Sequence, residues 1–117
     1  MFRVIKFGGS SLATADRVKN VASITKGIAA DGHPTVLVVS AIGGITDQLI
    51  DCAKTAQRDG AAAFEKLEKI KERHYDVYPE DMKDRATEQI ILNHIEELRD
   101  ILKAVSLIRV SSAARFG

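Results

Sequence analysis

Two short apolar segments, Phe2–Phe7 and Thr35–Ser40, each run into a pair of glycines that have hydroxyl side chains beside them. The first continues into Gly8–Ser11 and the second into Gly43–Thr46, and a helical pattern follows each loop. The second segment is continuously apolar and β-branched, which is typical of a parallel strand buried on both faces. This order predicts a βαβ unit with both glycine loops at the carboxyl edge of a parallel sheet, where open α/β sheets bind ligands.

The first loop carries the residue types that bind phosphate. Glycines let backbone N–H groups approach an anion, and Lys6, directly before the loop, adds a point charge. The order is not that of a P-loop, in which the lysine follows the glycines, and no GxGxxG pattern occurs. The alternative is a tight strand-to-helix turn, with Ser11 or Thr14 as helix N-cap. For the second loop, the alternative is that Thr46 is an N-cap and Asp47 a first-turn charge.

The run Lys6-Phe7-Gly8-Gly9-Ser10-Ser11 resembles the amino-terminal KFGG[TS]S signature of the aspartokinases. A second stretch, which contains Ser40-Ala41 and Gly44-Ile45-Thr46-Asp47, resembles another motif of that family at a fitting distance. The resemblance implies the amino-acid-kinase fold, an αβα sandwich around a largely parallel sheet. It also implies transfer of the ATP γ-phosphoryl group to the β-carboxylate of L-aspartate, a step toward lysine, threonine, methionine and isoleucine.

The same resemblance implies a role for each matching residue. Lys6 is the expected catalytic residue, stabilising charge on the transferring phosphoryl group, and Mg²⁺ is expected to be held mainly through ATP rather than by the protein. The ligands are expected to be ATP and L-aspartate. The residues expected to bind ATP and its phosphates are Lys6, Gly8, Gly9, Ser10 and Ser40, and those expected to bind aspartate are Ser11 and Thr46.

Two other functions stay open. One is another amino-acid or carboxylate kinase of the same fold, although such relatives usually lack the second motif. The other is a non-catalytic remnant whose helices serve as an interaction module. The family has a substrate-binding Glu in a Phe-Gly-Glu motif, whereas this sequence reads Phe116-Gly117. We therefore expect an amino-terminal, incomplete kinase domain with little or no activity by itself.

The remaining elements follow from hydrophobic spacing. Helices are expected over Ser11–Ala30 and Asp47–Arg58, and from Ala61 to about Val110 with a break at Tyr78-Pro79. We expect one incomplete domain over residues 1–117, with the motifs in 1–60 and a helical part in 61–117. The helical part is expected to be an antiparallel pair. Its apolar residues are Phe64, Leu67, Ile70 and Val77 before the break, and Ile91, Ile95, Leu98, Leu102 and Val105 after it.

Composition excludes several classes of function. Seventeen Lys and Arg against 16 Asp and Glu give a net charge of +1, and aromatic residues make up only 5%, so we expect no nucleic-acid surface. The one cysteine, Cys52, fits a reducing cytoplasm and a small buried side chain. No pattern of metal ligands and no membrane span is expected. Association into homo-oligomers stays open.

Overall fold

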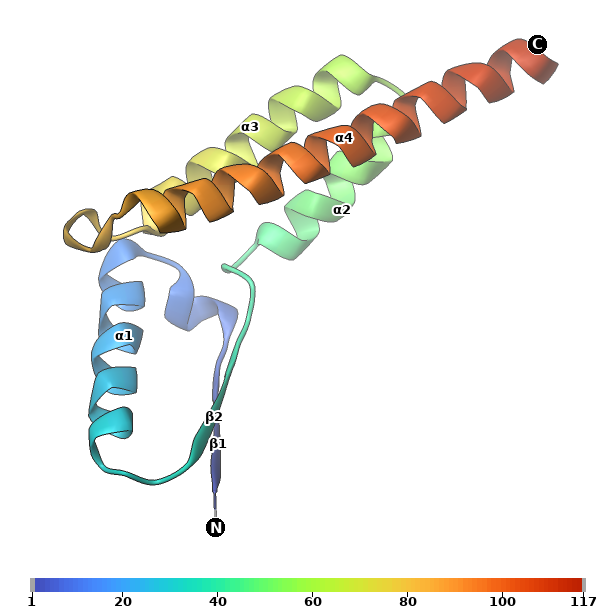
Figure 1. Cartoon of the computed structure of the whole chain (residues 1–117). Helices are drawn as coiled ribbons and strands as arrows, with labels where there is room; N and C mark the ends of the chain where they lie inside the picture. Colours follow the sequence, from blue (N-terminus) through green and yellow to red (C-terminus); the bar gives the residue numbers. More distant parts are fainter. Residues whose placement is uncertain (1, 117) are drawn as a thin grey trace. The chain divides into compact units, whose positions relative to one another are not determined.

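The structure is a computed structural model that describes the backbone of residues 2–116 and the side chains of residues 2–108. Gly117, the second residue of the Phe-Gly pair, lies outside the described residues. Two compact units divide the chain: residues up to Thr46 with His74–Met82, and Asp47–Arg73 with the residues from Lys83 onward. The elements in chain order are β1 (Arg3–Phe7), η1 (Gly9–Leu12), α1 (Ala15–Ala30), β2 (Thr35–Val39), α2 (Ile45–Ala56), α3 (Gly60–Val77), η2 (Glu80–Met82) and α4 (Arg85–Phe116) (Figure 1).

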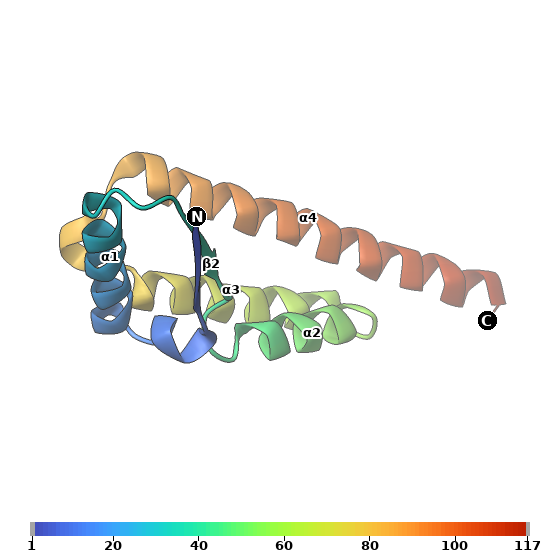
Figure 2. The same cartoon turned by 90° about the horizontal axis from the view of Figure 1, so that it is seen from below.

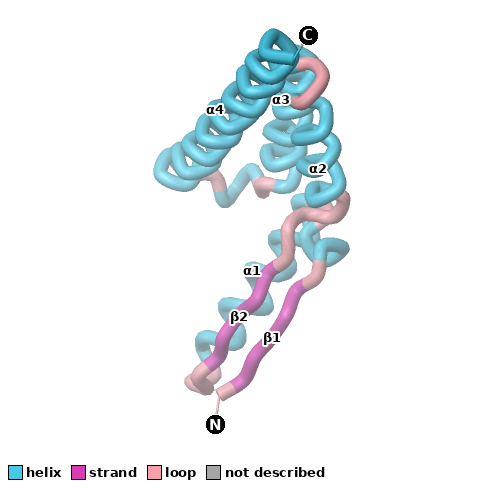
Figure 3. Tube along the Cα trace, turned by 90° about the vertical axis from the view of Figure 1, so that its right-hand side faces the viewer, coloured by secondary structure: helices cyan, strands magenta, loops and turns pink. Residues whose placement is uncertain are grey.

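In the first unit, β1 and β2 form a parallel two-stranded sheet whose register runs from Arg3 opposite Thr35 to Phe7 opposite Val39. The backbone N–H of Ser40 extends this ladder by donating to the carbonyl of Phe7 at 3.0 Å. Figure 3 shows the two strands side by side, with α1 alongside them. The predicted parallel pair and its crossover helix are therefore confirmed.

The prediction that Thr35–Ser40 is a buried strand is wrong for this chain. Val36, Val38 and Val39 are 49%, 43% and 61% exposed. The reason is that β2 has one strand neighbour and one covering helix, whereas burial of a parallel strand needs layers on both faces of the sheet. The apolar sequence of β2 is typical of a strand that is buried on both faces of a larger sheet, and the described residues cover it only in part.

The helix after the first glycine loop begins later than predicted. Residues Gly9–Leu12 form the 3₁₀ turn η1, and α1 begins only at Ala15. Thr14 is the N-cap of α1, because its hydroxyl accepts a hydrogen bond from the backbone N–H of Arg17 at 3.2 Å. The interpretation of Thr14 as the cap is thus correct, and that of Ser11 as the cap is wrong. Ser11 instead lies inside the 3₁₀ turn.

At the end of this unit opposite the glycine loops, an ion pair joins the start of β1 to the C-terminal end of α1. The guanidinium of Arg3 donates to both carboxylate oxygens of Asp31, at 2.8 and 2.7 Å. The backbone N–H of His33 and the Arg3 guanidinium lower the pKa of Asp31 to about 2, from an ordinary value of 3.8. Gly32, at φ +76°, then reverses the chain toward β2.

Helix α2 begins at Ile45, two residues before the predicted start, so Thr46 lies in its first turn and is not the N-cap. The earlier start follows from Gly44, whose φ of +86° is a left-handed conformation that turns the chain directly into the helix. Ile45 is 2% exposed and anchors this turn.

The second unit is built around α2, α3 and α4 (Figure 2). Its core consists of side chains at most 7% exposed, and Cys52 donates through Sγ to the carbonyl of Ala63 at 3.3 Å. Burial raises the pKa of the Cys52 thiol, as its expected role as a small buried side chain requires. Among the side chains that the structure describes, the buried apolar residues of this unit are Cys52, Ala56, Ala63, Leu67, Ile70, Ile95 and Leu102.

The predicted antiparallel helix pair is confirmed. Arg99 of α4 donates to Glu68 of α3 at 2.7 Å, and its guanidinium lies 5.4 Å from the centroid of the Phe64 ring. Gly60, at the start of α3, faces Ser106, in the C-terminal half of α4. The break falls at Tyr78 and Pro79 as expected, and α4 continues past the predicted end near Val110 to Phe116.

Candidate functional site

Lys6 lies next to the last residue of β1 and carries a side chain exposed to solvent. Exposure alternates along β1, so that Ile5 and Phe7 are partly covered and Lys6 points to the opposite face. Lys6 forms no ion pair with any carboxylate in the described part of the chain. Its ammonium group is therefore free to meet an anion at the carboxyl edge of the sheet.

The first glycine loop offers backbone donors at this edge. Gly8 is the N-cap of η1 and is exposed, with φ −79° and ψ 176°. Gly9 and Ser10 are the first residues of η1, so their N–H groups have no acceptor within that turn. Successive unpaired N–H groups next to a lysine form an anion-binding arrangement.

The second glycine loop meets the first through the backbone. The N–H of Gly43 donates to the carbonyl of Gly9 at 3.1 Å. A Cβ atom on Gly9 would lie 3.2 Å from the carbonyl oxygen of Ala41 and 3.2 Å from the Cα of Gly43. Glycine at both positions is what allows the ends of β1 and β2 to form one continuous edge.

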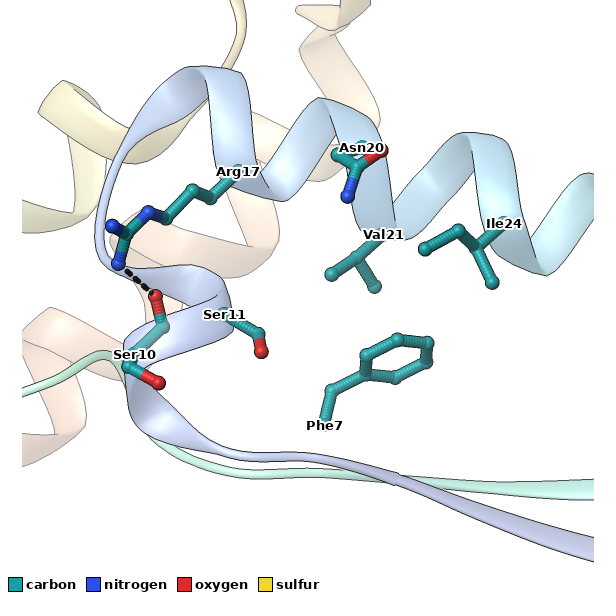
Figure 4. Close-up of a pocket in the computed structure, with 7 residues that line it drawn as sticks. All are labelled: Phe7, Ser10, Ser11, Arg17, Asn20, Val21 and Ile24. Carbon is teal, nitrogen blue, oxygen red and sulfur yellow. Dashed lines mark hydrogen bonds between the residues drawn. The ribbon is translucent and has the colours of Figure 1, made fainter.

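A pocket of about 330 Å³ opens on the other side of this edge, between Phe7, η1 and α1 (Figure 4). Ser10, Ser11, Arg17 and Asn20 supply its polar groups, and Phe7, Val21 and Ile24 supply its apolar floor. Figure 4 shows the Arg17 guanidinium reaching back over the turn to the carbonyl of Ser10, where the distance is 2.7 Å. Arg17 was not predicted as a site residue, although its place in the first turn of a helix after a glycine loop was a usable signal.

The structure thus brings most of the expected site residues to one edge of the sheet. Lys6, Gly8, Gly9 and Ser10 follow one another at the end of β1, and Ser40 is exposed directly beyond β2. Ser11, in contrast, lines the pocket on the α1 side of the sheet, away from the face that carries Lys6. Thr46 is exposed in the first turn of α2. The ligands assigned to these residues stay predictions.

The described residues carry neither a cluster of metal ligands nor a membrane-spanning helix. They contain no group of three or more His, Cys, Asp or Glu side chains placed to hold a metal ion. None of the described helices combines the length and the apolar character needed to cross a bilayer.

The architecture and the two loops can be compared with known proteins. The profile of the amino acid kinase family matches residues 1–111. The chain belongs to the amino acid kinase family. Its small parallel sheet with helices is accordingly a part of that family's αβα fold, as the two motifs predict.

Members of the family with aspartokinase names are similar in sequence. Aspartokinase 1 from the chloroplasts of Arabidopsis thaliana is 35% identical over 109 residues, which are 91% of this chain and 18% of that protein. The aspartokinase of Chlamydia pneumoniae is 43% identical over 65 residues, which are 56% of this chain and 14% of that protein. The chain therefore spans about a fifth of the length of the first of these relatives.

Solved structures of the family agree. Escherichia coli aspartokinase III in complex with aspartate and ADP superposes with a TM-score of 0.70 at 27% identity, over 92% of this chain and 23% of that one. The same enzyme in complex with lysine and aspartate superposes with a TM-score of 0.69 at 27% identity, over 91% of this chain and 23% of that one. The resemblance to the aspartokinases that the motifs indicate is confirmed.

Proposed function

We propose that this chain carries the phosphate-binding edge of an aspartate kinase, which transfers the ATP γ-phosphoryl group to the β-carboxylate of L-aspartate. The observation that carries the proposal is the backbone contact between Gly9 and Gly43 beside the unpaired Lys6. It is supported by the aspartokinase relatives and by the similarity to a structure of aspartokinase III that contains aspartate and ADP. The product would be aspartyl phosphate, the precursor of lysine and threonine that the resemblance implies.

The phosphate side of the reaction would use Lys6 and the first loop. Phosphoryl transfer depends on positioning and on electrostatic stabilisation rather than on covalent chemistry by the protein. The Lys6 ammonium would stabilise charge on the transferring group, while the N–H groups of Gly8, Gly9 and Ser10 hold the phosphates. Ser40 would contact ATP from the end of β2, and Mg²⁺ would reach the site bound to the nucleotide.

The aspartate side would use Ser11 and Thr46. Both carry hydroxyls that can donate to a carboxylate, and each is the last residue of its glycine loop. Thr46 would approach the substrate from the first turn of α2, and Ser11 from the α1 side of the sheet. Residues 1–60 would supply these motifs to one kinase domain, and 61–117 its helical part. Since the one cysteine, Cys52, is a free thiol, a reducing cytoplasm is the compartment that we propose.

We also propose that the 117 residues alone bind nucleotide but turn over aspartate slowly or not at all. The basis is that the chain spans about a fifth of the length of its Arabidopsis relative. Formation of aspartyl hydroxamate by the purified chain, dependent on both ATP and aspartate, would contradict this part of the proposal.

The test of the proposed function is titration of the ¹⁵N-labelled chain with Mg·ADP. We expect amide shifts to concentrate in residues 6–11 and 40–46. Lys6→Met removes the charge with little change in volume and should weaken binding about tenfold, as for one charge-assisted bond to phosphate. Lys26→Met, on the exposed part of α1, is the matched control and should bind as the wild type does. Equal affinity in all three proteins, or shifts elsewhere, would refute the proposal.

The choice of carboxylate substrate separates aspartate kinase from other kinases of the fold. L-Aspartate and L-glutamate differ by one methylene group, so each is titrated in the presence of Mg·ADP. Shifts at Ser11 and Thr46 with aspartate alone would support the assignment, and shifts with glutamate alone would favour another member of the family.

A further inference from the structure

Three consecutive carbonyl groups of the first glycine loop each accept a hydrogen bond. The carbonyl of Gly8 accepts from the N–H of Ser11 at 3.1 Å, and that of Gly9 from the N–H of Gly43 at 3.1 Å. The carbonyl of Ser10 accepts from Nη1 of Arg17 at 2.7 Å. The C=O and N–H of one trans peptide point in opposite directions, so the bonded carbonyls of Gly8 and Gly9 fix the directions of the unpaired N–H groups of Gly9 and Ser10. The N–H of Ser11, in contrast, is itself bonded within the turn.

The third of these hydrogen bonds differs from the other two in its chemistry. It comes from a charged side chain and is short, whereas the neighbouring bond from the N–H of Ala13 to the same carbonyl is long, at 3.4 Å. Hydrogen bonds with one ionised partner are roughly twice as strong as neutral ones. Arg17 is therefore the stronger of the two partners of the Ser10 carbonyl, while the N–H of the same peptide group, that of Ser11, is bound by the Gly8 carbonyl.

Arg17 is itself well placed to act as a restraint. Its backbone N–H is bound by the Thr14 hydroxyl, so that its Cα is fixed in the first turn of α1. Its guanidinium makes no ion pair with an acidic side chain in the described part of the chain. No carboxylate thus competes with the Ser10 carbonyl for the guanidinium, and Arg17 also lines the pocket that Ser11 and Asn20 line (Figure 4).

We propose that Arg17 is a positioning residue, which holds the Ser10 carbonyl and thereby the turn whose unpaired N–H groups, those of Gly9 and Ser10, face the phosphates of the nucleotide. The proposal rests on the proposed function, because it deepens the role of the same loop. Arginine suits this position because its planar fork can bind the carbonyl with one N–H while keeping others free. A lysine offers a point charge on a flexible stem and would hold the peptide less firmly.

The experiment compares Arg17→Met and Arg17→Lys with wild type and with Lys26→Met, which removes a charge from the same helix. Amide hydrogen exchange is measured without ligand, and Mg·ADP is then titrated. We expect Arg17→Met to speed exchange at Ser11 and Ala13 about tenfold and to weaken Mg·ADP binding by a similar factor, as loss of one charge-assisted bond predicts. Arg17→Lys should lie between Arg17→Met and wild type, and Lys26→Met should match wild type in both measurements.

Unchanged exchange and unchanged binding in Arg17→Met would overturn the proposal. Weaker binding with unchanged exchange would also overturn it, since Arg17 would then contact the ligand rather than hold the loop. If the wild type bound no Mg·ADP and Arg17→Met still sped amide exchange, the restraint of the loop by Arg17 would be supported. Only the proposed function would then be refuted. A melting temperature near that of the wild type shows that a variant folds. If Arg17→Met does not fold, Arg17→Lys is compared with the wild type in its place.

Discussion

At the scale of single residues, the glycines of the two loops have different tasks. Gly9 and Gly43 are in backbone contact, and any side chain on Gly9 would meet backbone atoms that cannot rotate away. Gly8 has no atom within 4 Å of the place where a Cβ would lie, and its φ of −79° suits any residue. The requirement for glycine beside the lysine is therefore strict at position 9 and weak at position 8 for packing reasons alone.

This contrast predicts that Gly9→Ala destabilises the chain by about 1–3 kcal/mol, the usual cost of inserting atoms into a packed site. Because the two loops must move apart, Mg·ADP binding should weaken as well. Gly8→Ala is the matched control and should change stability by about 0.5 kcal/mol or less. Urea denaturation measures both effects, and equal stability of the two variants would show that the loops are not packed as described.

At the scale of elements, α4 illustrates how one helix carries two kinds of apolar residue. Leu102 is 2% exposed and belongs to the face that packs within the second unit, whereas its neighbour Ile101 is 59% exposed. The 4-3-4-3 spacing around Ile95 and Leu102 locates the buried face correctly, because residues three and four apart share one side of a helix.

We predict that Leu102→Ala lowers the free energy of unfolding by about 2–5 kcal/mol, through lost burial and a residual cavity. Ile101→Ala should cost about 0.5 kcal/mol or less, since the side chain is exposed and alanine favours the helix. Thermal unfolding followed by circular dichroism at 222 nm compares the two. A larger loss for Ile101→Ala would mean that the face of α4 is assigned wrongly.

The ends of the elements were harder to predict than their order. Two parallel strands with a crossover helix and the break at Tyr78-Pro79 follow from local patterns. The 3₁₀ turn at Gly9–Leu12 does not, because serine and glycine are equally compatible with a helix start and with a turn. The Thr14 cap decides between them only once the N–H of Arg17 is seen to reach its hydroxyl.

At the scale of the whole molecule, the sheet has more apolar surface than its own chain covers. Val4, opposite Val36 in the register, is 62% exposed, and Val36 itself is 49% exposed. Both strands are edge strands, and exposed apolar edges are templates for pairing between molecules.

We expect the 117-residue chain to associate as its concentration rises, and Val36→Lys to suppress this association because a charge on the strand opposes pairing. Sedimentation velocity over a range of concentrations measures the effect. We expect Val36→Lys to raise severalfold the concentration at which half of the chains are associated. Ile101→Lys provides the comparison, since it places the same charge on an exposed apolar position of α4. If Ile101→Lys suppressed association and Val36→Lys did not, the surface responsible for association would be α4 and not the sheet.

The sequence alone determined the βαβ order, the parallel pairing, the helix pair, the family and the run of residues at the sheet edge. These depend on local periodicity, on turn chemistry and on motifs that are contiguous in the chain. The exposure of β2, the contact of Gly9 with Gly43 and the hydrogen bond from Arg17 to Ser10 became evident from the three-dimensional packing alone. The physical reason is that burial and close contact depend on which distant segments approach one another, and no short pattern records that.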